Sequence, residues 1–271
     1  MTAIRTDRHE NVIAGLIGQG MPVVVLAPHL GDAAASCGAL LTYAVSRTPV
    51  TVVTFFTEGG QAPYARPARR YLRRVGARDA EAAYRWRRDE DRAALEPLGI
   101  TCVHAGLTEA LFRRRPANLS PSKLTHVYPF YLAHVTSGRI VAADAGLLGE
   151  VREIIHRVAG SGVNLVLAPL GLGGHVDRIL VRTAAQSSGG PVAYYRDVPG
   201  GRRDPAAEAF IYRHDLVETR WPEPAEAKAE LIRTYGSLTG QRLPGAGDPL
   251  APEVFFSAAR PAATASSAWW R

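Results

Sequence analysis

The chain has 271 residues, a length that fits one large domain or two modest ones. Its 32 Lys and Arg against 25 Asp and Glu give a formal net charge of +7, and arginine supplies nearly all of the positive side. No basic stripe interleaved with aromatic residues accompanies this charge, so we interpret it as a solvated arginine surface and exclude nucleic acid as a partner. No apolar run approaches the length of a membrane span, which excludes a membrane-embedded protein.

The two cysteines, Cys37 and Cys102, lie in apolar segments and lack the CxxC spacing of a redox or zinc motif. We expect both to be buried free thiols in a reducing compartment. The first ten residues are polar and contain no apolar core of a signal peptide. These features predict a cytoplasmic protein whose partner is a small-molecule substrate, with a homo-oligomer left open.

The stretch at residues 22–44 organises the rest of the chain. The aliphatic run at 23–26 predicts a buried strand, and residues 33–44 predict a helix rich in small side chains. A polar turn between a strand and a helix N-terminus is where open α/β sheets usually place their chemistry. We therefore expect His29 and Asp32 to point into a crevice there. The alternative is that Asp32 only caps the helix and His29 only fills a turn.

The next segments continue the alternation of strands and helices. We expect a strand over 50–56, an exposed loop over 61–78 that is either a lid or a plain surface loop, a helix over 79–98 and a strand over 100–104. The dense charge run at residues 87–92 predicts a solvated helix face.

The middle of the chain contains a second polar turn. Residues 113–143 have no strong periodicity, and we predict an irregular insertion that walls the substrate pocket. A helix over 144–159 and a strand over 163–168 lead into residues 169–178 (PLGLGGHVDR), whose glycines let the backbone approach a ligand closely. A helix over 177–187 follows.

We expect shorter strands and helices in the last third of the chain. They are a strand over 191–195 with Asp197 at its end, a strand over 208–212, a helix over 224–237 and a strand over 253–257. Strands alternating with helices predict a single α/β domain over residues 1–260, with a mostly parallel Rossmann-like sheet flanked by helices. Residues 261–271 are rich in Ala and Ser and predict a disordered tail.

Five stretches of this chain occur together, and in the same order, in one known family. They are residues 28–38 (PHLGDAAASCG), 87–94 (RRDEDRAA), 104–114 (HAGLTEALFRR), 173–178 (GGHVDR) and 194–199 (YYRDVP). They resemble the motifs PHLDDA(V/A)LSCGG, RRxEDxAA, HLxxxDAxxRR, GGHxDH and YEDxP of the PIG-L/LmbE-like family of metal-dependent N-deacetylases and amidases. The resemblance covers most of residues 21–257 and implies the Rossmann-like fold of that family.

The resemblance also implies a metal site, from which this chain departs at two positions. In the family a divalent metal, usually zinc, is bound at the positions of His29, Asp32 and Arg178, and the general base stands at the position of Gly31. Arginine stays protonated and offers no lone pair, and glycine has no side chain to take a proton from water. We therefore predict that the metal site is lost, that His29 and Asp32 are remnant ligands, and that no cofactor is needed.

The remaining residues of the two motifs form a candidate site of their own. The resemblance implies an acid/base pair of His175 and Asp177, and Arg178 can serve as a fixed cation in place of the metal. These three are the predicted catalytic residues. The predicted substrate-binding residues are His29, Asp32, Arg88 and Glu109. In the alternative interpretation, Arg178 and Asp32 only form a buried ion pair that fills a dead pocket.

Three functions of different classes remain as hypotheses. The first is an enzyme acting on a small polar metabolite, in bacterial secondary metabolism, that works without metal through the His175–Asp177 pair and an Arg178 anchor. The second is an N-deacetylase or amidase that still recruits zinc through His29, Asp32 and His175. The third is a non-catalytic binding or partner subunit that keeps the fold and the pocket.

Overall fold

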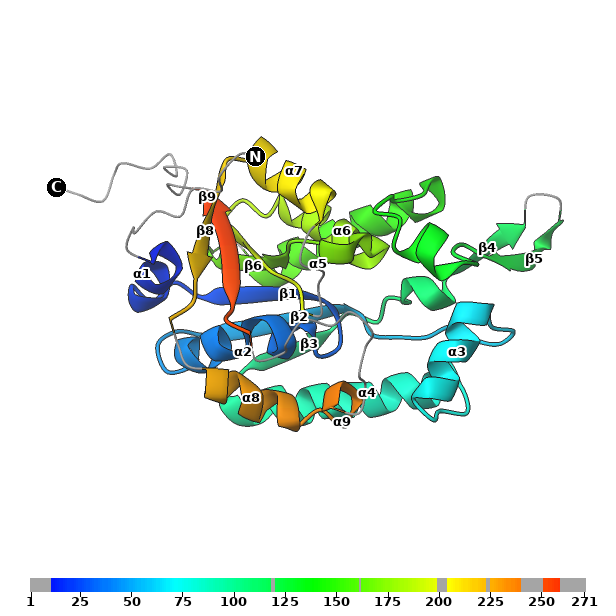
Figure 1. Ribbon diagram of the computed structural model, residues 1–271, viewed down its shortest axis with the longest axis horizontal. Coiled ribbons are helices and arrows are strands. Elements are labelled where there is room, and N and C mark those ends of the chain that lie inside the picture. The colour runs from blue at the N-terminus through cyan, green and yellow to red at the C-terminus, as the bar shows by residue number, and fades with distance from the viewer. Residues whose placement is uncertain are drawn as a thin grey trace.

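The fold is described by a computed structural model over residues 11–117, 120–160, 162–198, 204–222, 225–239 and 251–258 (Figure 1). The predicted tail from residue 261 lies outside these described residues.

Within the described residues, seven strands form the central sheet in the order β3-β2-β1-β6-β7-β9-β8. Their bounds are β1 Val23–His29, β2 Val50–Phe56, β3 Thr101–His104, β6 Leu165–Pro169, β7 Val192–Tyr195, β8 Leu216–Arg220 and β9 Val254–Ala258. The first five strands of that order are parallel, and β9 runs antiparallel to both β7 and β8. The prediction of a single α/β domain with a mostly parallel sheet is confirmed.

Helices cover both faces of this sheet. Their bounds are α1 Val12–Gly18, α2 Asp32–Ala44, α3 Arg66–Arg74, α4 Ala80–Leu95, α5 Ala145–Ala159, α6 Val176–Ala185, α7 Pro205–Arg213, α8 Ala225–Arg233 and α9 Gly236–Thr239. Figure 1 shows α5, α6 and α7 on one side of the sheet and α2, α4 and α8 on the other.

All seven residues of β1 are buried. The strand is buried on both faces because helices cover both sides of this mostly parallel sheet. Val23 and Val25 belong to the hydrophobic cluster that includes residues of α2, α4 and α8. Val24 and Leu26 belong to the cluster that includes residues of α5, α6 and α7. The alternation of side chains along the strand thus joins two apolar layers through the central strand.

The prediction of a strand over residues 208–212 is wrong. These residues lie in α7, whose start is determined by Asp204. Its carboxylate accepts hydrogen bonds from the backbone N–H groups of Ala206 and Ala207 at 2.9 and 3.2 Å, and Pro205 takes the first helical position. The strand of this region, β8, follows the helix.

Three segments are more ordered than the sequence predicted. The expected loop at 61–78 contains α3, and helix α1 at residues 12–18 was not predicted at all. The insertion at 113–143 contains a hairpin of β4, Arg114–Ala117, and β5, Ser120–His126, followed by a π-helical turn at Tyr131–Val135.

The sheet order reverses between β1 and β6, and this reversal creates the site. The chain leaves β1 toward β2 and β3 on one side, then returns through β6 and β7 on the other. In open α/β sheets, sites usually lie at the carboxyl ends of the two strands where the order reverses. His29 is the last residue of β1, and the glycine-rich turn at 170–175 follows β6, so the two motif turns meet there.

Within the described part of the chain, no helix is long and apolar enough to cross a membrane.

Gly59, after β2, packs directly against α4. A Cβ at this position would lie 2.5 Å from the Cβ of Ala80 and 3.0 Å from the ring of Tyr84. We expect Gly59→Ala to lower the free energy of unfolding by about 1–3 kcal/mol, because both neighbours belong to a helix that must shift. Urea unfolding measures this.

Gly149 in α5 is the matched control, since a Cβ there meets nothing within 4 Å. Gly149→Ala is expected to raise stability by up to about 1 kcal/mol, because alanine favours the helix. Equal stabilities of Gly59→Ala and the unchanged protein would contradict the packing described for this turn.

Candidate active site

The turn that follows β1 places two side chains, His29 and Asp32, at the carboxyl end of this central strand. Gly31 adopts a φ of +86°, which lets the chain reverse sharply between His29 and Asp32. Its backbone N–H donates to Asp91 Oδ1 at 3.1 Å, which anchors the turn to α4. His29 therefore ends β1 and Asp32 begins α2, and both side chains contact residues of the turn after β6.

The turn that follows β6 supplies three more side chains. His175 caps the N-terminus of α6, and Asp177 and Arg178 lie in its first turn. Gly174 packs so closely against the insertion that a Cβ would lie 3.0 Å from the carbonyl oxygen of Thr136, and its own carbonyl accepts a hydrogen bond from the N–H of Gly138 at 2.7 Å. The insertion at 113–143 thus lies against this turn, and its role as a wall of the substrate pocket stays a prediction.

Seven charged side chains alternate in sign across the site, and we call them the alternating ion-pair chain. In spatial order they are Asp197, Arg178, Asp32, His29, Asp177, Arg113 and Asp144. All seven are largely withdrawn from solvent, and each interior carboxylate faces a cation on both sides. Charges this deeply buried persist only when they are paired and hydrogen-bonded.

His29 stands at the middle of this chain, between two carboxylates. Its Nδ1 lies 3.2 Å from Asp32 Oδ2, and its Nε2 lies 3.1 Å from Asp177 Oδ2. Burial alone lowers the pKa of His29, but the hydrogen bonds to Asp177 and Asp32 outweigh it and raise the pKa to about 10. Both ring nitrogens therefore carry hydrogen and donate.

The two neighbouring carboxylates are held ionised by arginines. Burial raises the pKa of Asp32, but Arg178, whose Nη2 lies 3.6 Å from Asp32 Oδ1, lowers it to about 2. Burial likewise raises the pKa of Asp177, and Arg113, bound to its Oδ1, brings it well below its usual range. Asp177 Oδ2 also accepts a hydrogen bond from the N–H of Ala110 at 3.1 Å.

The two ends of the alternating ion-pair chain are closed by further contacts. Arg178 Nε lies 3.5 Å from Asp197 Oδ1, and Asp197 Oδ2 accepts from the backbone N–H groups of Gly171 and Leu172 at 2.6 and 2.8 Å. At the other end, Arg113 Nη1 lies 3.0 Å from Asp144 Oδ2. The hydroxyl of Tyr128 donates to the same oxygen at 2.6 Å.

Sequence reasoning gave no role to Arg113, Asp144 or Asp197. Arg113 belongs to the stretch at 104–114 that resembles a family motif, which was the available signal. Asp144 and Asp197 lie at the ends of predicted elements, and nothing in the sequence reveals which cation a distant carboxylate will face.

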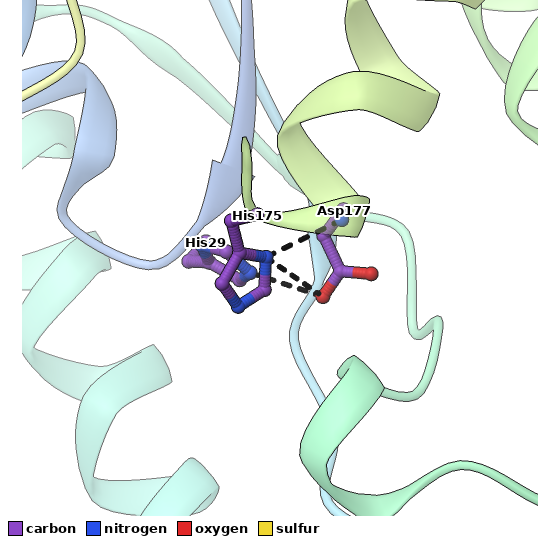
Figure 2. Close-up of side chains that lie close together, drawn as sticks. All are labelled: His29, His175 and Asp177. Carbon is purple, nitrogen blue, oxygen red and sulfur yellow. Dashed lines mark hydrogen bonds and ion pairs between the residues drawn. The ribbon is translucent and has the colours of Figure 1, made fainter. Parts of the chain in front are cut away.

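His175 lies beside His29 but outside the alternating ion-pair chain (Figure 2). The two rings meet edge to face with centroids 4.7 Å apart. His175 Nδ1 accepts a hydrogen bond from the backbone N–H of Asp177 at 3.3 Å. Burial and the neighbouring imidazolium of His29 lower the pKa of His175 to about 3. His175 is therefore neutral, with its hydrogen on Nε2.

This geometry differs in detail from the predicted pairing of His175 with Asp177. The closest approach of the Asp177 carboxylate to His175 Nδ1 is 4.0 Å, and its shorter contact is to His29. Burial and the charged ring of His29 also keep the pKa of His175 below the range in which an imidazole exchanges protons at neutral pH. The catalytic roles of His175, Asp177 and Arg178 stay predictions.

Glu109 and Arg88, the two other predicted substrate-binding residues, have different hydrogen-bond partners. Glu109 lies near enough to His29 to raise its pKa, and it accepts a hydrogen bond from the hydroxyl of Tyr84. Arg88 instead donates to the carbonyl of Thr57 at 2.8 Å, in the turn after β2. Its neighbour Arg87 contacts the motif turn, donating to the carbonyl of Leu30 at 2.9 Å.

The residues at the family's metal position do not fit a divalent ion as they are arranged. Both nitrogens of His29 and both carboxylate oxygens of Asp32 are engaged, and a guanidinium stands at the third position. Ligand atoms of His29, His175 and Asp177 lie within 4.8 Å of one another. However, Asp177 is already bound by Arg113 and by a backbone N–H.

Comparison with known proteins identifies the family. No family model matches the chain. A 2'-N-acetylparomamine deacetylase from Streptomyces fradiae is 32% identical over 231 residues, which are 80% of this chain and 73% of that protein. The chain belongs to the PIG-L/LmbE-like N-deacetylase family. By the motif resemblance, the chain departs from the family at Gly31, where a general base is expected, and at Arg178, where a metal ligand is expected.

Two solved structures share the fold of this PIG-L/LmbE-like chain. The zinc-inhibited form of teicoplanin deacetylase superposes with a TM-score of 0.63 at 22% identity, covering 87% of this chain and 97% of that one. The A40926 pseudoaglycone deacetylase gives a TM-score of 0.56 at 23% identity, covering 88% and 96%. Both similarities cover most of the chain and confirm the fold expected from the resemblance.

The raised pKa of His29 predicts how stability depends on pH. A group whose pKa rises from 6.5 to about 10 on folding contributes stability that is fully present below pH 6.5 and is lost between those values. We expect the stability difference between the wild type and His29→Gln to decrease as pH rises through this window. Urea unfolding at several pH values measures it, and a pH-independent difference would show that His29 is not charged.

Proposed function

We propose that this protein is a PIG-L/LmbE-like enzyme of secondary metabolism that acts on the N-acyl group of a small polar amine, without a metal at His29 and Asp32. The alternating ion-pair chain carries this proposal, because it engages the ligand atoms that a metal would need. The relative from Streptomyces fradiae is named as a 2'-N-acetylparomamine deacetylase, which supports an N-acetylated amine as the substrate class.

Arg178 and His175 are the groups that we assign to the carbonyl oxygen of the substrate. When water adds to an amide carbonyl and its proton passes to a second solvent molecule, negative charge develops on the carbonyl oxygen, and fixed donors stabilise it. Arg178 remains charged at all relevant pH values, since Asp197 and Asp32 outweigh its burial and raise its pKa. His175 is neutral, and its Nε2–H is turned away from Asp177 (Figure 2).

His29 acts on the reaction through its charge. Its imidazolium lies against His175 and is held by two carboxylates, so it contributes a positive potential without needing to move a proton. Asp177 is a positioning residue, since its backbone N–H orients His175 and its carboxylate holds His29. The predicted role of His175 as an acid/base catalyst is a weaker assignment, because an imidazole with a pKa of about 3 is a poor base.

Two aromatic residues of the insertion suit the binding of a ring-containing metabolite. Phe130 and Tyr131 are 62% and 44% exposed. Burial and Glu109 raise the pKa of Tyr131, and Arg178 opposes the rise, so this ring lies within electrostatic reach of two site residues. An apolar ring face beside fixed polar donors is the usual composition of a small-molecule site.

One observation favours a non-catalytic role as the second candidate. The family's base position is occupied by Gly31, and the carboxylates of Asp32 and Asp177 are held by arginines at a low pKa. His175 has a pKa of about 3, and both nitrogens of His29 carry hydrogen, so neither imidazole offers a base of the usual strength. A subunit that binds the metabolite and passes it to an active partner would keep this arrangement.

Release of acetate from 2'-N-acetylparomamine tests both candidates. Under the enzymatic proposal, His175→Ala lowers kcat by about 10²- to 10³-fold, the effect of removing one oxyanion donor. His214→Ala, at the exposed end of α7, is the matched control and leaves kcat unchanged. Unchanged turnover in His175→Ala would contradict the assigned role, and binding of the compound without any acetate release would support the second candidate.

A further inference from the structure

We propose that Asp91, Cys102 and His104 form a zinc site, separate from the family's metal position. We call these three residues the β3–α4 cluster. The inference does not depend on the proposed function, because none of the three belongs to the alternating ion-pair chain.

The fold brings the three side chains together from two neighbouring elements. Cys102 and His104 are two residues apart on β3, so their side chains lie on the same face of this strand. Helix α4 packs across that face and directs Asp91 toward it. Asp91 is only 1% exposed, although it lies in the charge run at 87–92 that predicted a solvated face. A buried carboxylate needs hydrogen-bond or ionic partners, whereas the solvent-exposed residues of the run are hydrated by water.

The distances between the three ligand atoms match the edges of a tetrahedral zinc site. Asp91 Oδ2 lies 2.9 Å from His104 Nε2, Cys102 Sγ lies 3.4 Å from His104 Nε2, and Cys102 Sγ lies 3.7 Å from Asp91 Oδ2. Ligands around zinc at the usual Zn–O, Zn–N and Zn–S lengths are separated by about 3.3, 3.6 and 3.5 Å in the same order. A zinc ion can therefore bind if each distance between two ligand atoms changes by at most about 0.4 Å.

The other oxygen of Asp91 is already oriented by its neighbours. Asp91 Oδ1 accepts hydrogen bonds from the backbone N–H of Gly31 at 3.1 Å and from the hydroxyl of Tyr235 at 2.9 Å. These contacts aim Oδ2 at the imidazole and the thiol, in the way that outer contacts orient ligating carboxylates. This differs from Asp32 and Asp177, whose carboxylates face arginines.

The chemistry of the donors selects the metal. One sulfur, one imidazole nitrogen and one carboxylate oxygen suit zinc, whereas magnesium and calcium prefer oxygen donors alone. Cys102 is half-buried, and β3 is one of the two edge strands of the sheet, so solvent can supply the ion and a fourth ligand. A bound ion would join β3, α4 and, through Asp91, the turn at Gly31.

Metal analysis of four proteins tests this inference. The wild type, His29→Ala, Cys37→Ser and Cys102→Ser are purified without chelator after growth with added zinc, and zinc is measured by mass spectrometry. We expect about one zinc ion per chain in the first three and almost none in Cys102→Ser. Cys37 is the matched control, because it is the other cysteine of the chain and is buried in the core.

The outcomes separate the two proposals. Full zinc content in Cys102→Ser, or none in the wild type, overturns the zinc site and leaves the proposed function intact. Loss of zinc in His29→Ala but not in Cys102→Ser overturns both, since the ion would then lie at the family's position.

A measurement on the unaltered chain covers the case in which Cys102→Ser does not fold. Native protein is treated with iodoacetamide, with and without zinc, and the alkylation of each cysteine is followed by peptide mass spectrometry. We expect zinc to slow the alkylation of Cys102 at least tenfold. Equal rates with and without zinc would overturn the site.

Discussion

His29 lies between two carboxylates, and the charge state of the whole site depends on this contact. Because Asp32 and Asp177 both bind the imidazole, its doubly protonated form is favoured despite burial. Two carboxylates around one imidazolium leave an excess of negative charge, which Arg178 and Arg113 neutralise from either side. Arg178 is thus part of the alternating ion-pair chain, between Asp197 and Asp32. Removing one member of such a pattern leaves a buried charge without its partner, which is strongly destabilising.

The same contact explains why His175 behaves differently from His29. The two rings are neighbours, yet one has a strongly raised pKa and the other a strongly lowered one. Two imidazolium ions at this distance would repel each other, so the histidine with the better carboxylate contacts keeps the proton. The other becomes a neutral donor. Adjacent groups whose pKa values are driven apart are typical of sites that bind or transform a polar substrate.

Much of the fold could be predicted from the sequence, because strong local signals agree with the tertiary structure. The aliphatic runs at 23–26 and 50–56 became β1 and β2, and the two polar turns met where the sheet order reverses. The prediction of a strand over residues 208–212 was wrong because their composition fits either a strand or a helix. The N-cap at Asp204 favours the helix. Local periodicity cannot resolve such short segments.

The site was predictable as a set of motif residues but not as a set of contacts. The resemblance gave the positions of His29 and His175, and the loss of a ligand at Arg178. It could not reveal that Asp177 would bind His29 in preference to His175, because that choice depends on where Arg113 and Ala110 lie in space. Which polar side chains far apart in the sequence contact each other depends on tertiary packing, and local sequence patterns do not specify it.

The protonation of His29 tests this account most directly, since the charge pattern of the site follows from it. Nitrogen-15 NMR of the imidazole, assigned with His29→Gln, reports the state of each ring nitrogen at pH 8. With a pKa of about 10, both nitrogens are expected to carry hydrogen at that pH, with shifts that do not change when zinc is added. A non-protonated nitrogen at pH 8 whose shift moves on addition of zinc would contradict the account, because His29 would then be free to act as a metal ligand.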